Sequence, residues 1–95
     1  MVSTTPFDAA DYLDSPEMIA DYLTEAFASE DPALITKAIG AVARAKGMSG
    51  VAEDTGLSRE NLYRALGGGA KPEFATVLKV LHALGINLVA QPKVA

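Results

Sequence analysis

The chain has no cysteine and a single histidine, His82. Without cysteine there is neither a disulfide nor a thiolate metal site, and one histidine supports neither a zinc site nor a Ser/His/Asp constellation. Aromatic residues make up 6% of the chain and tryptophan is absent. This composition favours a core of aliphatic side chains and alanine, as in small helical proteins. We therefore expect an all-α protein that is not an enzyme and has no catalytic residue, no metal site and no cofactor.

Long apolar runs are also missing. No run is long enough to span a bilayer, and no basic segment precedes an apolar stretch at the N-terminus. The 95 residues are 49% hydrophobic and show no internal repeat, which fits one small domain with a modest core. We expect a soluble, cytoplasmic protein without membrane attachment.

Positive charge is absent from the first third of the chain. Residues 1–31 contain eight acidic residues and no lysine or arginine, which gives −8, whereas the remainder has eight basic and four acidic residues, which gives +4. Exposed charges are screened over about 8 Å at physiological salt, so each segment presents its own local field. The acidic segment suits a cationic partner and the basic one suits nucleic acid. The alternative is that residues 1–31 form an ordinary solvated face.

Capping signals and apolar spacing predict five helices. Ser15 with Pro16 and Asp31 with Pro32 each combine a capping side chain with proline at the first helical position. Gly47 should end the second helix, and a last helix should run from Pro72 to Gly85. The side chains predicted to face the core are Ile19, Tyr22, Leu23, Ala26 and Phe27, then Leu34, Ile35, Ala38, Ile39 and Val42, and finally Phe74, Val77, Leu78, Leu81 and Leu84.

The two ends of the chain are expected to differ in structure. Residues 1–14 are interpreted as a loosely ordered acidic lead-in anchored by Phe7, Tyr12 and Leu13, and residues 15–95 as one domain. The weak alternation of residues 86–91 favours a short strand. A lone strand has unpaired backbone groups, so we expect it to pair with its twin in a homodimer.

Residues 48–66 carry the strongest functional signal, because they read as a helix-turn-helix. Ala52 is small where the two helices must touch, and Gly56 gives the backbone freedom of a tight turn. Leu57, Leu62 and Ala65 would bury the inner face of the second helix, which leaves its outer face for DNA. The candidate DNA-binding residues are Ser49, Ser58, Arg59, Glu60, Asn61, Tyr63, Arg64 and Lys71.

Each of these candidates also has a plainer interpretation. Arg59 and Arg64 suit base edges or phosphates, because arginine is the commonest bidentate partner of guanine, but they also suit an exposed helix. The two serines are equally needed as helix caps. Tyr63 either stacks on the sugar-phosphate wall or packs at the rim. Glu60 opposes phosphates unless it accepts from a cytosine amino group or restrains Arg64, four residues on.

The stretch SGVAEDTGLSRENLYRAL followed by KPEFATVLKVLHALG resembles the HigA-type addiction-module antidote proteins, antitoxins of the Cro/repressor-like helix-turn-helix superfamily. The lead-in FDAADYLD and the segment Ile19–Leu23 are similar to the same group, so the resemblance covers roughly residues 7–90.

The resemblance implies a five-helix Cro/repressor-like domain that binds double-stranded operator DNA, represses its own operon and neutralises a small basic toxin of the RelE/ParE-like class. The charge division independently places the toxin on the acidic segment, and the residues assigned to it are Asp14, Glu17, Asp21 and Glu25. A stand-alone, phage-type transcriptional regulator without a toxin partner and an interaction module that does not bind DNA are the alternatives.

Overall fold

The computed structural model describes residues 9–94. Within them, five α-helices follow a short 3-10 helix and no strand forms. The elements are η1 (Ala9–Tyr12), α1 (Pro16–Ser29), α2 (Pro32–Lys46), α3 (Met48–Thr55), α4 (Arg59–Ala65) and α5 (Phe74–Ala83). The all-α class and the five helices are therefore confirmed, whereas the short strand over residues 86–91 is wrong.

The first two helices begin where the capping signals predict. Ser15 Oγ accepts a hydrogen bond from the Met18 N–H at 3.1 Å, and Asp31 Oδ1 accepts one from Ala33 N–H at 3.1 Å. Between the helices, Glu30 adopts a left-handed conformation with φ 57°, which ends α1 and turns the chain into α2. Gly47, with φ 108°, ends α2 as expected.

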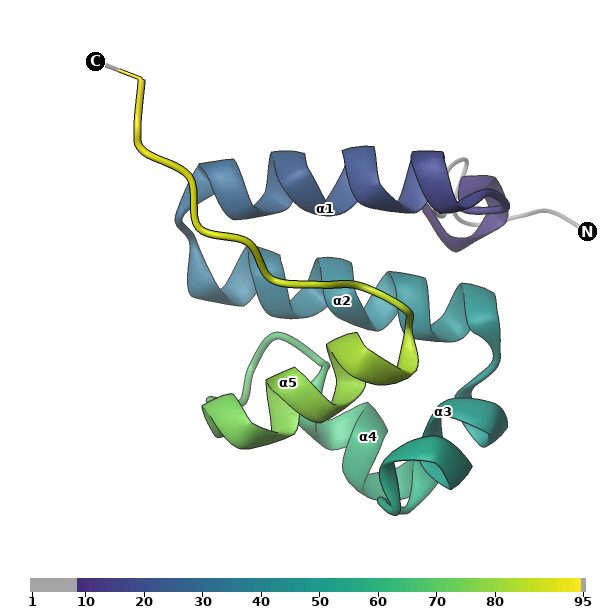
Figure 1. The fold of residues 1–95 in the computed structure, drawn as a ribbon. Coiled ribbons are helices and arrows are strands. Elements are labelled where there is room, and N and C mark those ends of the chain that lie inside the picture. The colour runs from purple at the N-terminus through teal and green to yellow at the C-terminus, as the bar shows by residue number, and fades with distance from the viewer. Residues whose placement is uncertain (1–8, 95) are drawn as a thin grey trace, which may run out of the picture.

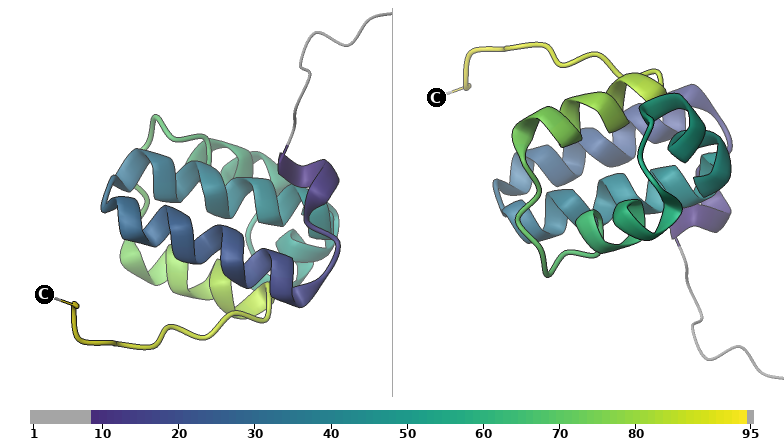
Figure 2. Two further views of the ribbon diagram at one scale, coloured as in Figure 1. Left: turned by 90° about the horizontal axis from the view of Figure 1, so that it is seen from above. Right: turned by 90° about the horizontal axis from the view of Figure 1, so that it is seen from below.

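Helix α2 lies at the centre of the molecule. It packs against α1 on one side and against α3 on the other, and α3 in turn contacts α4 and α5. Seen from above, α1 and α2 lie side by side in front; seen from below, α3, α4 and α5 face the viewer (Figure 1, Figure 2). Fully buried side chains from α1, α2, α4 and α5 meet between these layers: Leu23, Ile39, Val42, Leu62, Val80 and Leu81.

Three leucine or phenylalanine side chains predicted to face the core are instead exposed: Leu34 by 47%, Phe74 by 66% and Leu78 by 41%. At 100° per residue, the buried stripe of α5 is centred on Val77, Val80 and Leu81, and the other two α5 positions lie to one side of it. Helix α5 also begins two residues later than predicted, at Phe74 instead of Pro72, with Glu73 as its N-cap. Leu34 lies in the first turn of α2, where only part of the helix is covered.

The segment before α1 is more ordered than expected. Residues 9–12 form η1, which packs against α2, and Leu13 is 8% exposed and anchors this segment as predicted. Tyr12 is half-exposed, and Phe7 lies outside the described residues.

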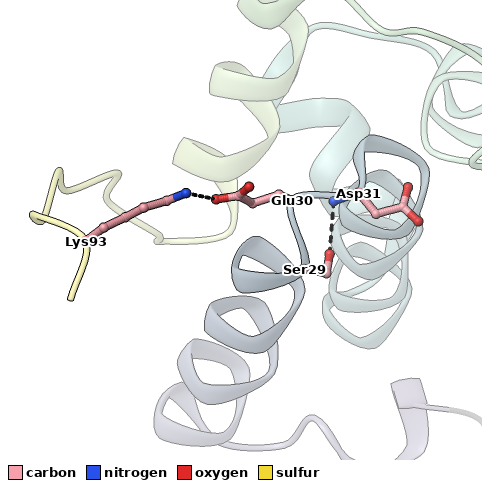
Figure 3. A network of polar contacts seen from close by, with 4 residues as sticks. All are labelled: Ser29, Glu30, Asp31 and Lys93. Atoms are coloured by element: carbon pink, nitrogen blue, oxygen red, sulfur yellow. Dashed lines mark hydrogen bonds and ion pairs between the residues drawn. The ribbon is translucent and has the colours of Figure 1, made fainter. Parts of the chain in front are cut away.

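The C-terminal tail, residues 86–94, is an irregular extended segment that crosses in front of α2 and then passes the C-terminal end of α1 (Figure 1). At its start the Ile86 N–H donates to Leu81 O at 2.9 Å, and near its end Lys93 Nζ lies 2.8 Å from Glu30 Oε2 (Figure 3). This ion pair is largely exposed and therefore contributes little to stability. The tail does not form a strand because the elements around it are helices, which offer no edge for backbone pairing.

Within residues 9–94, no helix combines the length and the apolar character that crossing a membrane requires.

Candidate functional site

Helices α3 and α4 are joined by a turn of three residues. Gly56 takes the left-handed conformation with φ 76°, and its N–H donates to Ala52 O at 2.9 Å, which closes α3. The Leu57 N–H then donates to Thr55 Oγ1 at 3.3 Å, and Ser58 begins the next helix. Two short helices in contact across such a turn are consistent with a helix-turn-helix pair.

The inner face of this pair is apolar as predicted. Leu62 is completely buried, and Ala52 and Leu57 pack against the core from partly buried positions. Ala65 is also partly buried. Because these residues fix the inner face of α4, the side chains between them must point outward.

The outer face of α4 is polar and exposed. Its exposed side chains are Arg59, Glu60, Asn61, Tyr63 and Arg64. Ser58 is the cap of this helix, since its Oγ accepts from the Asn61 N–H at 3.0 Å. The structure therefore brings six of the eight predicted DNA-binding residues onto one short helix and its cap.

Two contacts organise the cations on this face. The Arg59 guanidinium carbon lies 5.9 Å from the centre of the Tyr63 ring, a cation-π distance. Arg64 Nη1 donates to Asn61 Oδ1 at 2.9 Å. Among the described residues, Asn61 and not Glu60 is thus the side chain that restrains Arg64. The face presents two oriented guanidinium groups, which suit guanine edges and phosphates.

The remaining two predicted residues lie outside α4. Ser49 is exposed in the first turn of α3, but it is not the cap: Gly47 occupies that position and supplies no side-chain hydrogen bond. The predicted cap was wrong because α3 follows α2 after a single glycine, so the helix already begins at Met48. Lys71 is exposed in the connection between α4 and α5.

A second polar surface lies on α1. Glu17, Asp21 and Glu25 are exposed and follow each other at every fourth residue, so they share one face of this helix, which we call the acidic stripe. Asp14 is exposed just before the helix. Helix α1 contains no lysine or arginine. Like charges four residues apart repel each other, so the stripe destabilises its own helix and favours a cationic neighbour.

The acidic stripe and the outer face of α4 belong to opposite layers of the molecule. Helix α1 lies in the layer seen from above, and α4 lies in the layer seen from below (Figure 2). The two surfaces therefore do not overlap.

Sequence reasoning missed one exposed apolar side chain beside the acidic surface, Leu34. A signal for it exists: the residue is the third of α2, two positions after Pro32, and residues of a first helical turn often extend beyond the helices that cover the rest.

Comparison with known proteins identifies the family. The model of a family described as "Probable addiction module antidote protein" matches residues 3–92. A protein of Haemophilus influenzae described as "Uncharacterized protein" is 47% identical over 85 residues, which covers 90% of this chain and 88% of that relative. No solved structure matches significantly. The chain therefore belongs to the family of probable addiction module antidote proteins.

Proposed function

We propose that this chain is the antitoxin of a type II toxin–antitoxin pair and that it represses its own operon by binding operator DNA. Membership of the antidote family supports the antitoxin role and implies a toxin partner. The observation that carries the DNA-binding part is the outward placement of Arg59, Asn61 and Arg64 on α4, which follows a three-residue turn and buries Leu62.

In this proposal α4 enters the major groove of a Cro/repressor-like complex. Arg59 and Arg64 donate to guanine edges or to phosphates, and Tyr63 keeps the Arg59 guanidinium in place. Asn61 holds Arg64 and, through its amide group, reaches a base edge. Glu60 accepts from a cytosine amino group. Ser49, Ser58 and Lys71 contact the backbone of the duplex and set the position of the helix.

The toxin is proposed to be a small basic protein of the RelE/ParE-like class that binds Asp14 and the acidic stripe. These carboxylates are exposed, and no lysine or arginine of α1 compensates them. A cationic toxin would relieve their mutual repulsion and would associate quickly through long-range attraction.

We also propose that the chain acts as a homodimer on an inverted repeat. Two half-sites about one helical turn apart, roughly 34 Å, require two linked α4 helices. The tail offers apolar side chains for such an association, since Leu88 is 49% exposed and Val89 is 73% exposed.

The proposed function is tested by two measurements on the full chain. A mobility shift on the DNA upstream of its own gene, at low and at physiological salt, should show specific binding that weakens with salt. Co-expression with the small basic protein encoded by the adjacent reading frame should yield a complex and restore growth. DNA binding without any such complex would favour a stand-alone regulator, and a complex without DNA binding would favour an interaction module.

A further inference from the structure

A groove of about 670 Å³ lies between the second half of α1 and the first half of α2. Ala26 and Ala38, each 4% exposed, form its floor. Tyr22 and Leu34 rise on opposite sides of it, the first partly buried and the second 47% exposed. Small residues on the floor and larger apolar ones on the walls leave room for inserted side chains.

Carboxylates stand at the rim of this groove. Glu25 lines it and is also the last member of the acidic stripe, so the stripe runs directly into the groove. Asp31 lines it from the start of α2. Only one of its oxygens, Oδ1, caps the helix, by accepting from Ala33 N–H and Leu34 N–H.

Lys37 is the one cation in the lining of the groove, and its packing directs its side chain partly away from the groove. Its aliphatic stem lies against Gly68 of the connection between α4 and α5, where a Cβ atom would collide with it. The groove therefore combines an apolar centre with carboxylates that continue into a stripe of negative charge. This combination matches an apolar segment flanked by lysine or arginine.

The walls decide which kind of segment fits. Both walls are helices, whose backbone groups are paired internally, so an extended strand would find no backbone partners there. From Tyr22 to Ser29 the groove follows α1 for about 10 Å, the length of roughly two helical turns. A short amphipathic helix can place its apolar residues into such a groove and its basic residues at the rim.

We propose that the groove between α1 and α2 is the docking site for a two-turn amphipathic helix of the toxin. Its apolar side chains pack on Leu34 and Tyr22, and its lysine or arginine side chains pair with Glu25 and Asp31. This inference rests on the proposed antitoxin function and gives the toxin-binding surface an apolar anchor beside the acidic stripe.

The test compares two leucine-to-arginine variants in the full chain, Leu34→Arg in the groove and Leu78→Arg on α5. The two leucines are similarly exposed, by 47% and 41%, and both are helical, so the substitutions disturb the fold to a similar degree. The probe is the purified basic protein from the adjacent reading frame, titrated by calorimetry. Leu34→Arg should weaken binding at least about 10-fold, because it removes an apolar anchor and repels a basic segment. Leu78→Arg should bind like the unchanged chain.

A milder variant, Leu34→Ala, guards against misfolding, and operator binding by each variant reports whether α4 is intact. If Leu34→Arg and Leu34→Ala bind the toxin as tightly as the unchanged chain does, the groove is not the docking site. The proposed antitoxin function would be unaffected by that result. If the unchanged chain binds no toxin, the proposed function fails and the groove falls with it. If Leu34→Arg changes the oligomeric state of the chain but leaves toxin binding unchanged, the groove is a contact between two copies of the chain. This result would also contradict the proposal.

Discussion

The exposed side chains of α4 restrain one another before any partner arrives. Arg59 lies over the Tyr63 ring, and Arg64 donates to Asn61 Oδ1. Long arginine side chains lose rotamer freedom when they bind, and this loss opposes affinity. Contacts already made in the free protein reduce that loss, so Tyr63 and Asn61 should contribute to DNA binding even where they do not touch the duplex.

Replacing either arginine by alanine should weaken operator binding and leave the fold intact, because both side chains are exposed. Loss of a bidentate base contact costs about 1–3 kcal/mol, or roughly 5- to 150-fold in affinity, and relaxes the preference at one base pair. Loss of a phosphate contact should lower affinity for all sequences alike.

The measurement is a titration of Arg59→Ala and Arg64→Ala against operator and scrambled duplexes. Lys79→Ala is the control, since it removes one exposed cation from α5. Operator affinity that both arginine variants retain in full would exclude α4 as the reading helix.

Replacing two different glycines by alanine should change the stability of the chain in opposite directions. A Cβ atom at Gly40 of α2 would lie 2.8 Å from Leu66 O, whereas one at Gly50 of α3 would meet nothing within 4 Å. Gly40→Ala should therefore lower the free energy of unfolding by about 1–3 kcal/mol through overpacking. Gly50→Ala should raise it by about 0.5–1 kcal/mol, because alanine is the better helix former.

Urea unfolding of both glycine variants measures these changes in the free energy of unfolding. The values are comparable if the slope of that free energy against urea concentration is the same as in the unchanged chain. If Gly40→Ala were as stable as the unchanged chain, the close approach of α2 to the end of α4 would be wrong.

At the scale of the element, features that depend on neighbouring residues in the sequence were predicted better than features that depend on packing between distant elements. The starts of α1, α2 and α4 follow from Ser15, Asp31 and Ser58, because a cap depends on three or four neighbouring residues. Within α4, the sorting of Leu62 inward and the charged residues outward also follows from spacing alone.

Packing at the edges of the helices could not be predicted in this way. Leu34 and Phe74 have apolar side chains at helical spacing, yet they lie in the first turns of their helices, where neighbouring elements cover them only in part. The pairing of Arg64 with Asn61 instead of Glu60 depends on side-chain rotamers, which the sequence pattern does not specify. The groove beside Leu34 was missed for the first of these reasons.

The acidic stripe should lower the stability of the isolated chain and speed its association with a basic toxin. Changing Asp21→Asn and Glu25→Gln together removes two like-charge contacts of α1, and each is worth about 0.2–0.5 kcal/mol. The isolated chain should become slightly more stable, while its association with the basic toxin becomes slower and less dependent on salt.

Thermal unfolding and stopped-flow association at two salt concentrations measure the two effects of this stripe variant. Glu53→Gln is the matched control, because this exposed glutamate of α3 has no acidic residue three or four positions away. Toxin association that keeps its full rate and salt dependence in the stripe variant would make the stripe an ordinary solvated face.

At the scale of the whole molecule, the acidic stripe and the two arginines of α4 lie in different layers. The acidic stripe of α1 and the groove beside it belong to the layer of α1 and α2, and α4 belongs to the other (Figure 2). A chain with a net charge of −4 can therefore still present a cationic helix to DNA.

Association of two copies should depend on the tail. Deleting residues 88–95 removes the exposed Leu88 and Val89 but keeps Ile86, whose N–H bonds to the end of α5. Light scattering should then show a shift toward monomer, with lower operator affinity because the two α4 helices are no longer linked. Lys93→Ala, which keeps the tail and breaks only an exposed ion pair, should remain dimeric. A full-length chain that is monomeric at high concentration would rule out this role of the tail.

The most direct test of the whole account is a titration of the basic toxin into the full chain, first free and then saturated with operator duplex. Because the two proposed surfaces lie in opposite layers, the account predicts one complex that contains toxin, antitoxin and DNA, with α4 still on the operator. Release of the toxin by the operator, or of the operator by the toxin without any change in the dimer, would place both partners on one face and contradict the account.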